Sequence, residues 1–121
     1  MTRNRKEDWY TRPVVFVTDV GKAINFYIDK LGFDKVWDYK DNEKIIVAQI
    51  NRGNKCEIIL AEDTNRSGLS RLFIELFPEE LKHLKSNIKK NKIKSRTSSW
   101  GMPIIEIKDP FGNELFFPTG E

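Results

Sequence analysis

The chain has 121 residues, of which 39% are hydrophobic and 12% aromatic, a composition that suits one domain with an ordinary buried core. Its apolar runs fall short of the roughly 20 residues that a membrane-spanning helix requires, and residues 1–12 are too charged for a secretory signal. We therefore expect a cytoplasmic protein with no membrane partner. The single cysteine, Cys56, lies in an apolar stretch and is expected to be a structural thiol.

The first half of the chain is predicted to form a strand, a helix and three further strands. The β-branched run at 14–17 favours a strand, and Thr18 or Asp19 can cap the helix that follows. Apolar residues at positions 20, 24, 27 and 31 form one helical stripe, which Gly32 can end. Turn-forming residues then separate strand-like stretches at 33–39, 44–50 and 56–61.

The second half repeats this order after a polar linker at 62–69. A strand is predicted at 71–77, and Pro78 marks the start of a helix with the apolar stripe Leu81, Leu84 and Ile88. Three more strands are predicted at 92–96, 103–108 and 113–117. The chain thus divides into an arm (1–12), a first βαβββ module (13–61), the linker, and a second βαβββ module (70–117), all within one α+β domain spanning 1–121.

Two stretches of the sequence resemble the vicinal oxygen chelate superfamily, which includes glyoxalases, bleomycin resistance proteins and dioxygenases. The stretch 13–33 contains Phe-Tyr followed by Leu-Gly-Phe, and the stretch 100–117 contains the turn Asp-Pro-Phe-Gly-Asn. The resemblance implies mixed sheets that curl around a cleft. Trp100-Gly101, just before the last hairpin, is similar to the bleomycin-resistance branch, in which such a tryptophan lines the drug groove.

The same resemblance argues against a metal. Metal-dependent members place His, Gln or Glu ligands on inward positions of the first and last strand of each module. Here those positions hold side chains without a suitable donor, namely Arg12, Ile59, Arg71 and Phe116. The only histidine, His83, lies off the helical stripe and is expected to face solvent. We therefore expect no metal, no cofactor and no catalytic residues.

The cleft is then predicted to be an apolar and aromatic slot with guanidinium groups at its edges. The resemblance implies that Trp37 and Trp100 line it, where the pair could sandwich a flat ring, although both could equally be core or dimer-contact residues. The predicted ligand-binding residues are Trp37, Tyr39, Ile59, Arg71, Phe73, Trp100 and Phe116. The resemblance also implies a homodimer that shares its grooves, with an N-terminal arm, including Trp9, that can cross to the partner.

Three functional hypotheses follow. The first is a metal-free protein that sequesters a hydrophobic or aromatic ligand such as a bleomycin-type glycopeptide antibiotic. However, those drugs are cationic whereas this chain has a net charge of +3, so a neutral or anionic aromatic ligand fits at least as well. The second hypothesis is a metal-dependent lyase or dioxygenase of the glyoxalase type with non-standard ligands drawn from Glu57, Glu75, Glu106 or Glu114.

The third hypothesis concerns the basic residues that crowd positions 82–96 and that could contact a polyanion. A solvated helix face explains these lysines more simply, because cations suit the last turn of a helix and no nucleic-acid-binding motif accompanies them. The sequence therefore disfavours a nucleic-acid partner.

Overall fold

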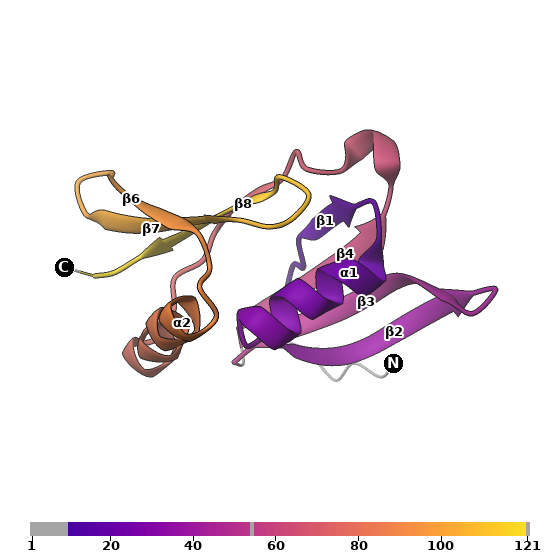
Figure 1. The fold of residues 1–121 in the computed structure, drawn as a ribbon, viewed down its shortest axis with the longest axis horizontal. Coiled ribbons are helices and arrows are strands. Elements are labelled where there is room, and N and C mark those ends of the chain that lie inside the picture. The colour runs from indigo at the N-terminus through magenta and orange to yellow at the C-terminus, as the bar shows by residue number, and fades with distance from the viewer. Residues whose placement is uncertain (1–9, 54, 121) are drawn as a thin grey trace.

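The fold is a pair of βαβββ modules, seen in a computed structural model that describes residues 10–53 and 55–120 (Figure 1). The arm residue Trp9 lies outside the described residues. The first module contains β1 (Val14–Val17), α1 (Val20–Ile24), a π-helix (Asn25–Lys30), β2 (Asp34–Asp41), β3 (Lys44–Arg52) and β4 (Cys56–Glu62). A short 3₁₀ helix (Thr64–Arg66) lies in the linker, and the second module contains β5 (Arg71–Phe73), α2 (Pro78–Lys90), β6 (Ser95–Ser99), β7 (Pro103–Lys108) and β8 (Glu114–Pro118).

Each module forms one four-stranded mixed sheet. The N-terminal sheet has the strand order β1-β4-β3-β2, and the C-terminal sheet has the equivalent order β5-β8-β7-β6. In each sheet the first and last strands of the module are parallel neighbours, and the remaining pairs are antiparallel. The predicted α+β fold with two βαβββ modules is confirmed. Among the described residues, no helix has both the length and the apolar character needed to cross a bilayer.

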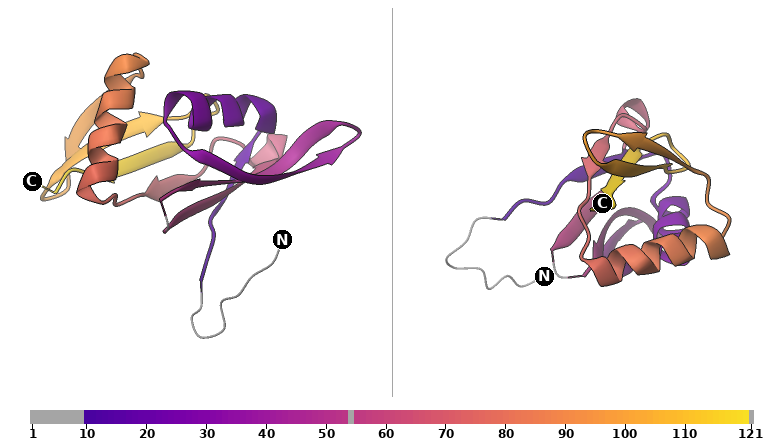
Figure 2. Two further views of the ribbon diagram at one scale, coloured as in Figure 1. Left: turned by 90° about the horizontal axis from the view of Figure 1, so that it is seen from below. Right: turned by 90° about the vertical axis from the view of Figure 1, so that its left-hand side faces the viewer.

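One continuous hydrophobic core joins the two modules. Strand alternation sends one set of side chains from each sheet toward this core, and α1 covers that face of the N-terminal sheet (Figures 1 and 2). Val20, Tyr27 and Leu31 of the predicted first helical stripe are fully buried, as is Leu84 of the second. The helices therefore occupy one face of each sheet and leave the opposite faces for other contacts.

Three elements differ from their predicted form. The first helix changes at Asn25 from α to π geometry, in which the Leu31 amide donates to the Phe26 carbonyl at 3.1 Å. The sequence did not predict this change, because the spacing of apolar side chains does not report a one-residue shift in the hydrogen-bond pattern. Strand β5 ends at Phe73, since only the amide of Ile74 still reaches β8 before the chain turns toward Pro78. Strand β6 begins three residues later than predicted, because the chain exits α2 through Lys92 with a φ of 54°.

A buried arginine ties α2 to the end of the first helix. Arg52 is only 4% exposed, and its Nε lies 3.0 Å from Glu80 Oε1 while its Nη1 donates to the Leu31 carbonyl. Two side-chain amides extend this contact: Asn87 of α2 donates to the same carbonyl at 3.0 Å, and Asn91, the residue after α2, donates to the Lys30 carbonyl at 2.8 Å. The second module thus supplies partners for carbonyls that the end of a helix leaves unpaired.

The turn between β7 and β8 forms a second polar link between the modules. The buried Asp109 carboxylate accepts hydrogen bonds from the Phe111 and Asn113 amides and the Asn113 side chain, each at 2.9 Å, and from the Tyr27 hydroxyl at 2.8 Å. Asn113 also donates to the Phe16 carbonyl at 3.1 Å. Burial, and then the neighbouring Asp109, raise the pKa of Tyr27 well above its ordinary value, so this hydroxyl remains a donor at neutral pH.

The linker approaches this turn so closely that only glycine fits at position 68. Gly68 has a φ of +82°, and a Cβ there would lie 2.2 Å from the Phe111 carbonyl oxygen. The Asp-Pro-Phe-Gly-Asn motif is therefore more than a local turn. It docks the end of the second module against the strand and helix of the first.

Candidate functional site

Each sheet has an open face, defined here as the face opposite the hydrophobic core. Alternation along the strands places Trp37, Tyr39 and Ile59 on the open face of the N-terminal sheet. Arg71, Phe73 and Phe116 lie on the open face of the C-terminal sheet, and Trp100 contacts the last two of them. The predicted ligand-binding residues thus form two groups within one chain, and the predicted Trp37–Trp100 pair is divided between the two sheets.

On the N-terminal sheet, a buried glutamine organises the open face. Ile59, Gln49 and Trp37 are cross-strand neighbours on β4, β3 and β2. The Gln49 Oε1 atom accepts hydrogen bonds from Trp37 Nε1 at 2.8 Å and from Arg12 Nη1 at 2.7 Å, and Nε2 donates to Asn51 Oδ1 at 2.9 Å. Gln49 therefore fixes the orientation of the indole and of the guanidinium. Sequence reasoning missed it, although a lone amide in the apolar strand Ile-Ile-Val-Ala-Gln-Ile is a usable signal.

On the C-terminal sheet, three aromatic rings gather on the open face. Trp100 stacks on Phe73 with ring centroids 5.5 Å apart and planes 22° apart, and it packs against Phe116 at 5.1 Å. Phe116 is 9% exposed, whereas Phe73 and Trp100 remain 48% and 53% exposed. We call these three residues the aromatic cluster. The Phe73 and Trp100 rings are therefore accessible to a planar molecule.

Charged side chains continue the same face beside the aromatic cluster. Arg96 Nε lies 2.9 Å from Glu106 Oε1, and Arg71 Nε lies 3.0 Å from Glu114 Oε1. The neighbouring Ser98 hydroxyl and then Arg96 lower the pKa of Glu106, although partial burial opposes them. A cavity of about 370 Å³ opens between β6, β7 and β8 at this charged end, lined by Lys94, Ser95, Arg96, Glu106, Ile107, Lys108 and Glu114.

The sequence matches a protein family whose name agrees with the resemblance described above. Residues 8–117 match the family model described as the Glyoxalase/Bleomycin resistance protein/Dioxygenase superfamily. The chain belongs to this superfamily. The curated proteins contain no significant match to the sequence.

Several solved structures share the fold of this chain at low sequence identity. The chain is similar to the antibiotic-binding protein TnmS3 of a Streptomyces species, with a TM-score of 0.70, 19% identity and coverage of 94% of this chain and 98% of that one. It is similar to the bleomycin-binding protein of Streptomyces verticillus, solved with copper(II)-bleomycin, with a TM-score of 0.68, 19% identity and coverage of 97% and 100%. Lactoylglutathione lyase of Agrobacterium tumefaciens gives a TM-score of 0.67, 19% identity and coverage of 95% and 96%. These likenesses show the fold.

The superfamily resemblance implies metal ligands at four positions. Ile59, Arg71 and Phe116 lie on the two open faces, and Arg12 lies just before β1. Arg12 is bound to Gln49, Arg71 is paired with Glu114, and Phe116 is packed under Trp100. Within residues 10–53 and 55–120, no three His, Cys, Asp or Glu side chains lie close enough together to hold a metal ion. His83 is exposed on α2, which confirms its predicted orientation.

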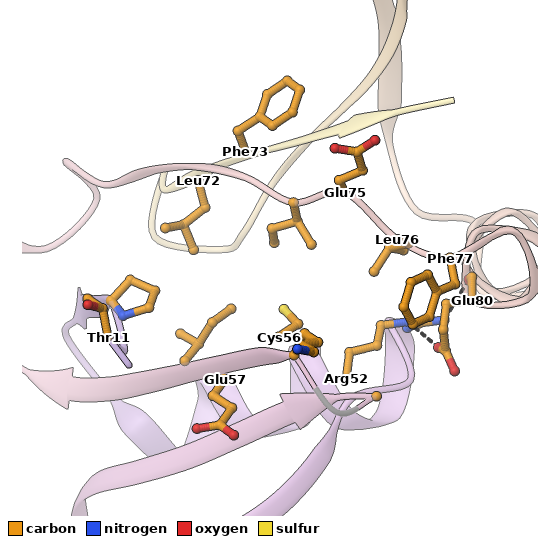
Figure 3. Close-up of a pocket in the computed structure, with 15 residues that line it drawn as sticks. Thr11, Arg52, Cys56, Glu57, Leu72, Phe73, Glu75, Leu76, Phe77 and Glu80 are labelled. Carbon is orange, nitrogen blue, oxygen red and sulfur yellow. Dashed lines mark hydrogen bonds and ion pairs between the residues drawn. The ribbon is translucent and has the colours of Figure 1, made fainter. Parts of the chain in front are cut away.

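A separate cavity of about 270 Å³ lies between the modules (Figure 3). It is bordered by Cys56 of β4, by Leu72 of β5 and by Leu76 of the segment that leads into α2, while the Phe73 ring points away from it (Figure 3). Burial raises the pKa of the Cys56 thiol to about 11, although Arg52 opposes the shift. Because the thiolate is scarce at neutral pH, Cys56 is a poor nucleophile, consistent with the structural role expected for it.

Proposed function

We propose that this chain captures an aromatic or hydrophobic small molecule without changing it chemically, and that it does so in the cytoplasm. The observation that carries this proposal is the aromatic cluster, because two of its rings, which stack on each other, are about half exposed on the open face of the C-terminal sheet. Each aromatic contact with a planar ligand adds about 0.5–1.5 kcal/mol beyond the area it buries. A bleomycin-type antibiotic is one candidate ligand, and sequestration needs only a dissociation constant below the ligand concentration.

The residues, rather than the fold, favour binding over metal-dependent catalysis. Antibiotic-binding and lyase structures resemble the chain equally well, with TM-scores of 0.70 and 0.67. The positions implied as ligands instead hold two guanidinium groups, an aliphatic side chain and a ring, none of which donates an electron pair to a divalent cation at neutral pH. These side chains are suited to stacking and to charge recognition.

We further propose that two copies of the chain complete the binding groove. Large apolar side chains are exposed on both open faces of a single chain, including Tyr39 at 59% and Val14 at 46% on the N-terminal sheet and the aromatic cluster on the C-terminal sheet. Closing one copy's N-terminal sheet over the other's C-terminal sheet would bring the two predicted groups together in one groove. Light scattering is expected to give twice the 14.2 kDa chain mass, and a monomer at micromolar concentration would argue against a shared groove.

Tryptophan fluorescence provides the test of binding. We expect at least one planar aromatic compound in a panel that includes bleomycin, phleomycin and uncharged and anionic ring compounds to quench the emission with saturation. The Trp100→Ala variant is expected to bind that compound at least about tenfold more weakly, equivalent to about 1.4 kcal/mol, because the cluster loses its central ring.

The Phe77→Ala variant is the matched control. Phe77 is also aromatic and 70% exposed, but it lies at the start of α2 rather than in the aromatic cluster. Its affinity should equal that of the parent protein. If no compound quenches, or if Trp100→Ala binds as tightly as Phe77→Ala, the proposed function is wrong.

A further inference from the structure

We propose that the ligand carries a carboxylate or a similar oxyanion next to its aromatic ring, and that Arg96 and Arg71 recognise this group. The proposal rests on the proposed function, because it concerns the charged end of the face that bears the aromatic cluster. It specifies the ligand class: a planar aromatic acid rather than a cationic or neutral ring compound.

The strand register sets both arginines beside the aromatic cluster. Arg96, Glu106, Phe116 and Phe73 are successive cross-strand neighbours on β6, β7, β8 and β5, so they form one row across the open face. Neighbouring strands lie about 4.8 Å apart, which puts the Arg96 backbone about 10 Å from that of Phe116. Arg71 precedes Phe73 by two residues on the same strand, about 7 Å away. A ring resting on Trp100 can therefore present a substituent to either guanidinium.

Each guanidinium group is held by one ion pair that leaves its terminal N–H groups available as donors. Each arginine uses its Nε to bind a glutamate, Glu106 for Arg96 and Glu114 for Arg71. In the described part of the chain, neither arginine donates a hydrogen bond from its Nη atoms, and their side chains are 78% and 75% exposed. A guanidinium fixed at Nε still offers its terminal N–H groups, which match a carboxylate in charge and geometry.

The charge balance at this end of the face favours an anion. Four basic side chains, Arg71, Lys94, Arg96 and Lys108, accompany only two carboxylates, Glu106 and Glu114. Glu114 lies within 4.0 Å of both Arg71 and Lys108, so its charge is already shared between two cations. A cationic ligand would therefore approach a surface with two positive charges in excess, whereas an anion would be attracted.

Three compounds that share a naphthalene ring and carry an anionic, a neutral or a cationic substituent test this proposal: 2-naphthoate, 2-naphthalenemethanol and 2-naphthylmethylammonium. Calorimetric titration of the full chain is expected to show 2-naphthoate binding about tenfold more tightly than the alcohol, with the ammonium compound weakest, and this preference should shrink at high salt. In the Arg96→Gln/Arg71→Gln double variant, the naphthoate affinity should fall to that of the alcohol while the alcohol affinity stays unchanged. Lys89→Gln, an exposed charge on α2, should leave all three affinities unaltered.

The outcomes separate this inference from the proposed function. If the alcohol or the ammonium compound binds as tightly as 2-naphthoate, the ligand class is wrong but an aromatic site remains. If the double variant keeps the preference for 2-naphthoate, the two arginines are not the recognition groups and the inference is overturned. If none of the three binds, this inference is overturned, whereas the proposed function is decided separately by the wider fluorescence panel and the Trp100→Ala variant.

Discussion

The Arg52→Ala variant is expected to unfold with a free energy about 3–5 kcal/mol lower than that of the parent protein. The reason is geometric. Arg52 is buried, and its removal leaves the Leu31 carbonyl and the Glu80 carboxylate without the guanidinium that bridges the first helix to α2. Urea denaturation followed by tryptophan fluorescence measures the change through the shift of the transition midpoint.

Arg66→Ala is the matched control, because Arg66 pairs with Asp63 at 2.9 Å but its side chain is 65% exposed. An exposed ion pair contributes about 1 kcal/mol or less. If Arg52→Ala proves as mild as Arg66→Ala, the buried arginine does not couple the two modules as the geometry indicates.

The Asp109→Ala variant is expected to be destabilised by about 3 kcal/mol or more, because it removes the acceptor of four hydrogen bonds at once. Tyr27→Phe removes only one of those donors and is expected to lower the free energy of unfolding by about 1 kcal/mol. Thermal and urea unfolding measure both changes.

The ordering of these variants is the informative result. Asp109→Asn keeps an acceptor oxygen and is expected to fall between Asp109→Ala and Tyr27→Phe. If Tyr27→Phe has no measurable effect while Asp109→Ala does, the Asp109 carboxylate contributes through the hydrogen bonds within the turn and not through its contact with Tyr27 of the first module.

Much of the fold could be predicted from local patterns in the sequence. The apolar stripe ending at Gly32 predicted the first helix, and Pro78 predicted the first residue of α2, because both signals act within a few residues. The π-helix could not be predicted in this way, since Tyr27 and Leu31 are buried in either helical form. The early end of β5 could not be predicted either, because it depends on pairing with β8, which the chain leaves after the Ile74 amide.

The sequence predicted residues that lie on the open faces of the sheets, but it did not predict how those residues are grouped. The superfamily resemblance predicted Trp37, Ile59, Phe73 and Phe116 as lining positions, and strand alternation places all four on open faces. The division between two sheets follows from how the modules pack through the core, which no single stretch of sequence encodes. The roles of Gln49 and of the arginine–glutamate pairs likewise depend on cross-strand register.

Nuclear Overhauser contacts between an aromatic ligand and the isotope-labelled protein test the central claim most directly. We expect contacts from the ring protons of 2-naphthoate to the Trp100 indole and to the Phe73 and Phe116 rings. Contacts instead to Leu72 and Leu76 in the cavity between the modules, or ring protons broadened by a stoichiometric bound metal, would contradict it.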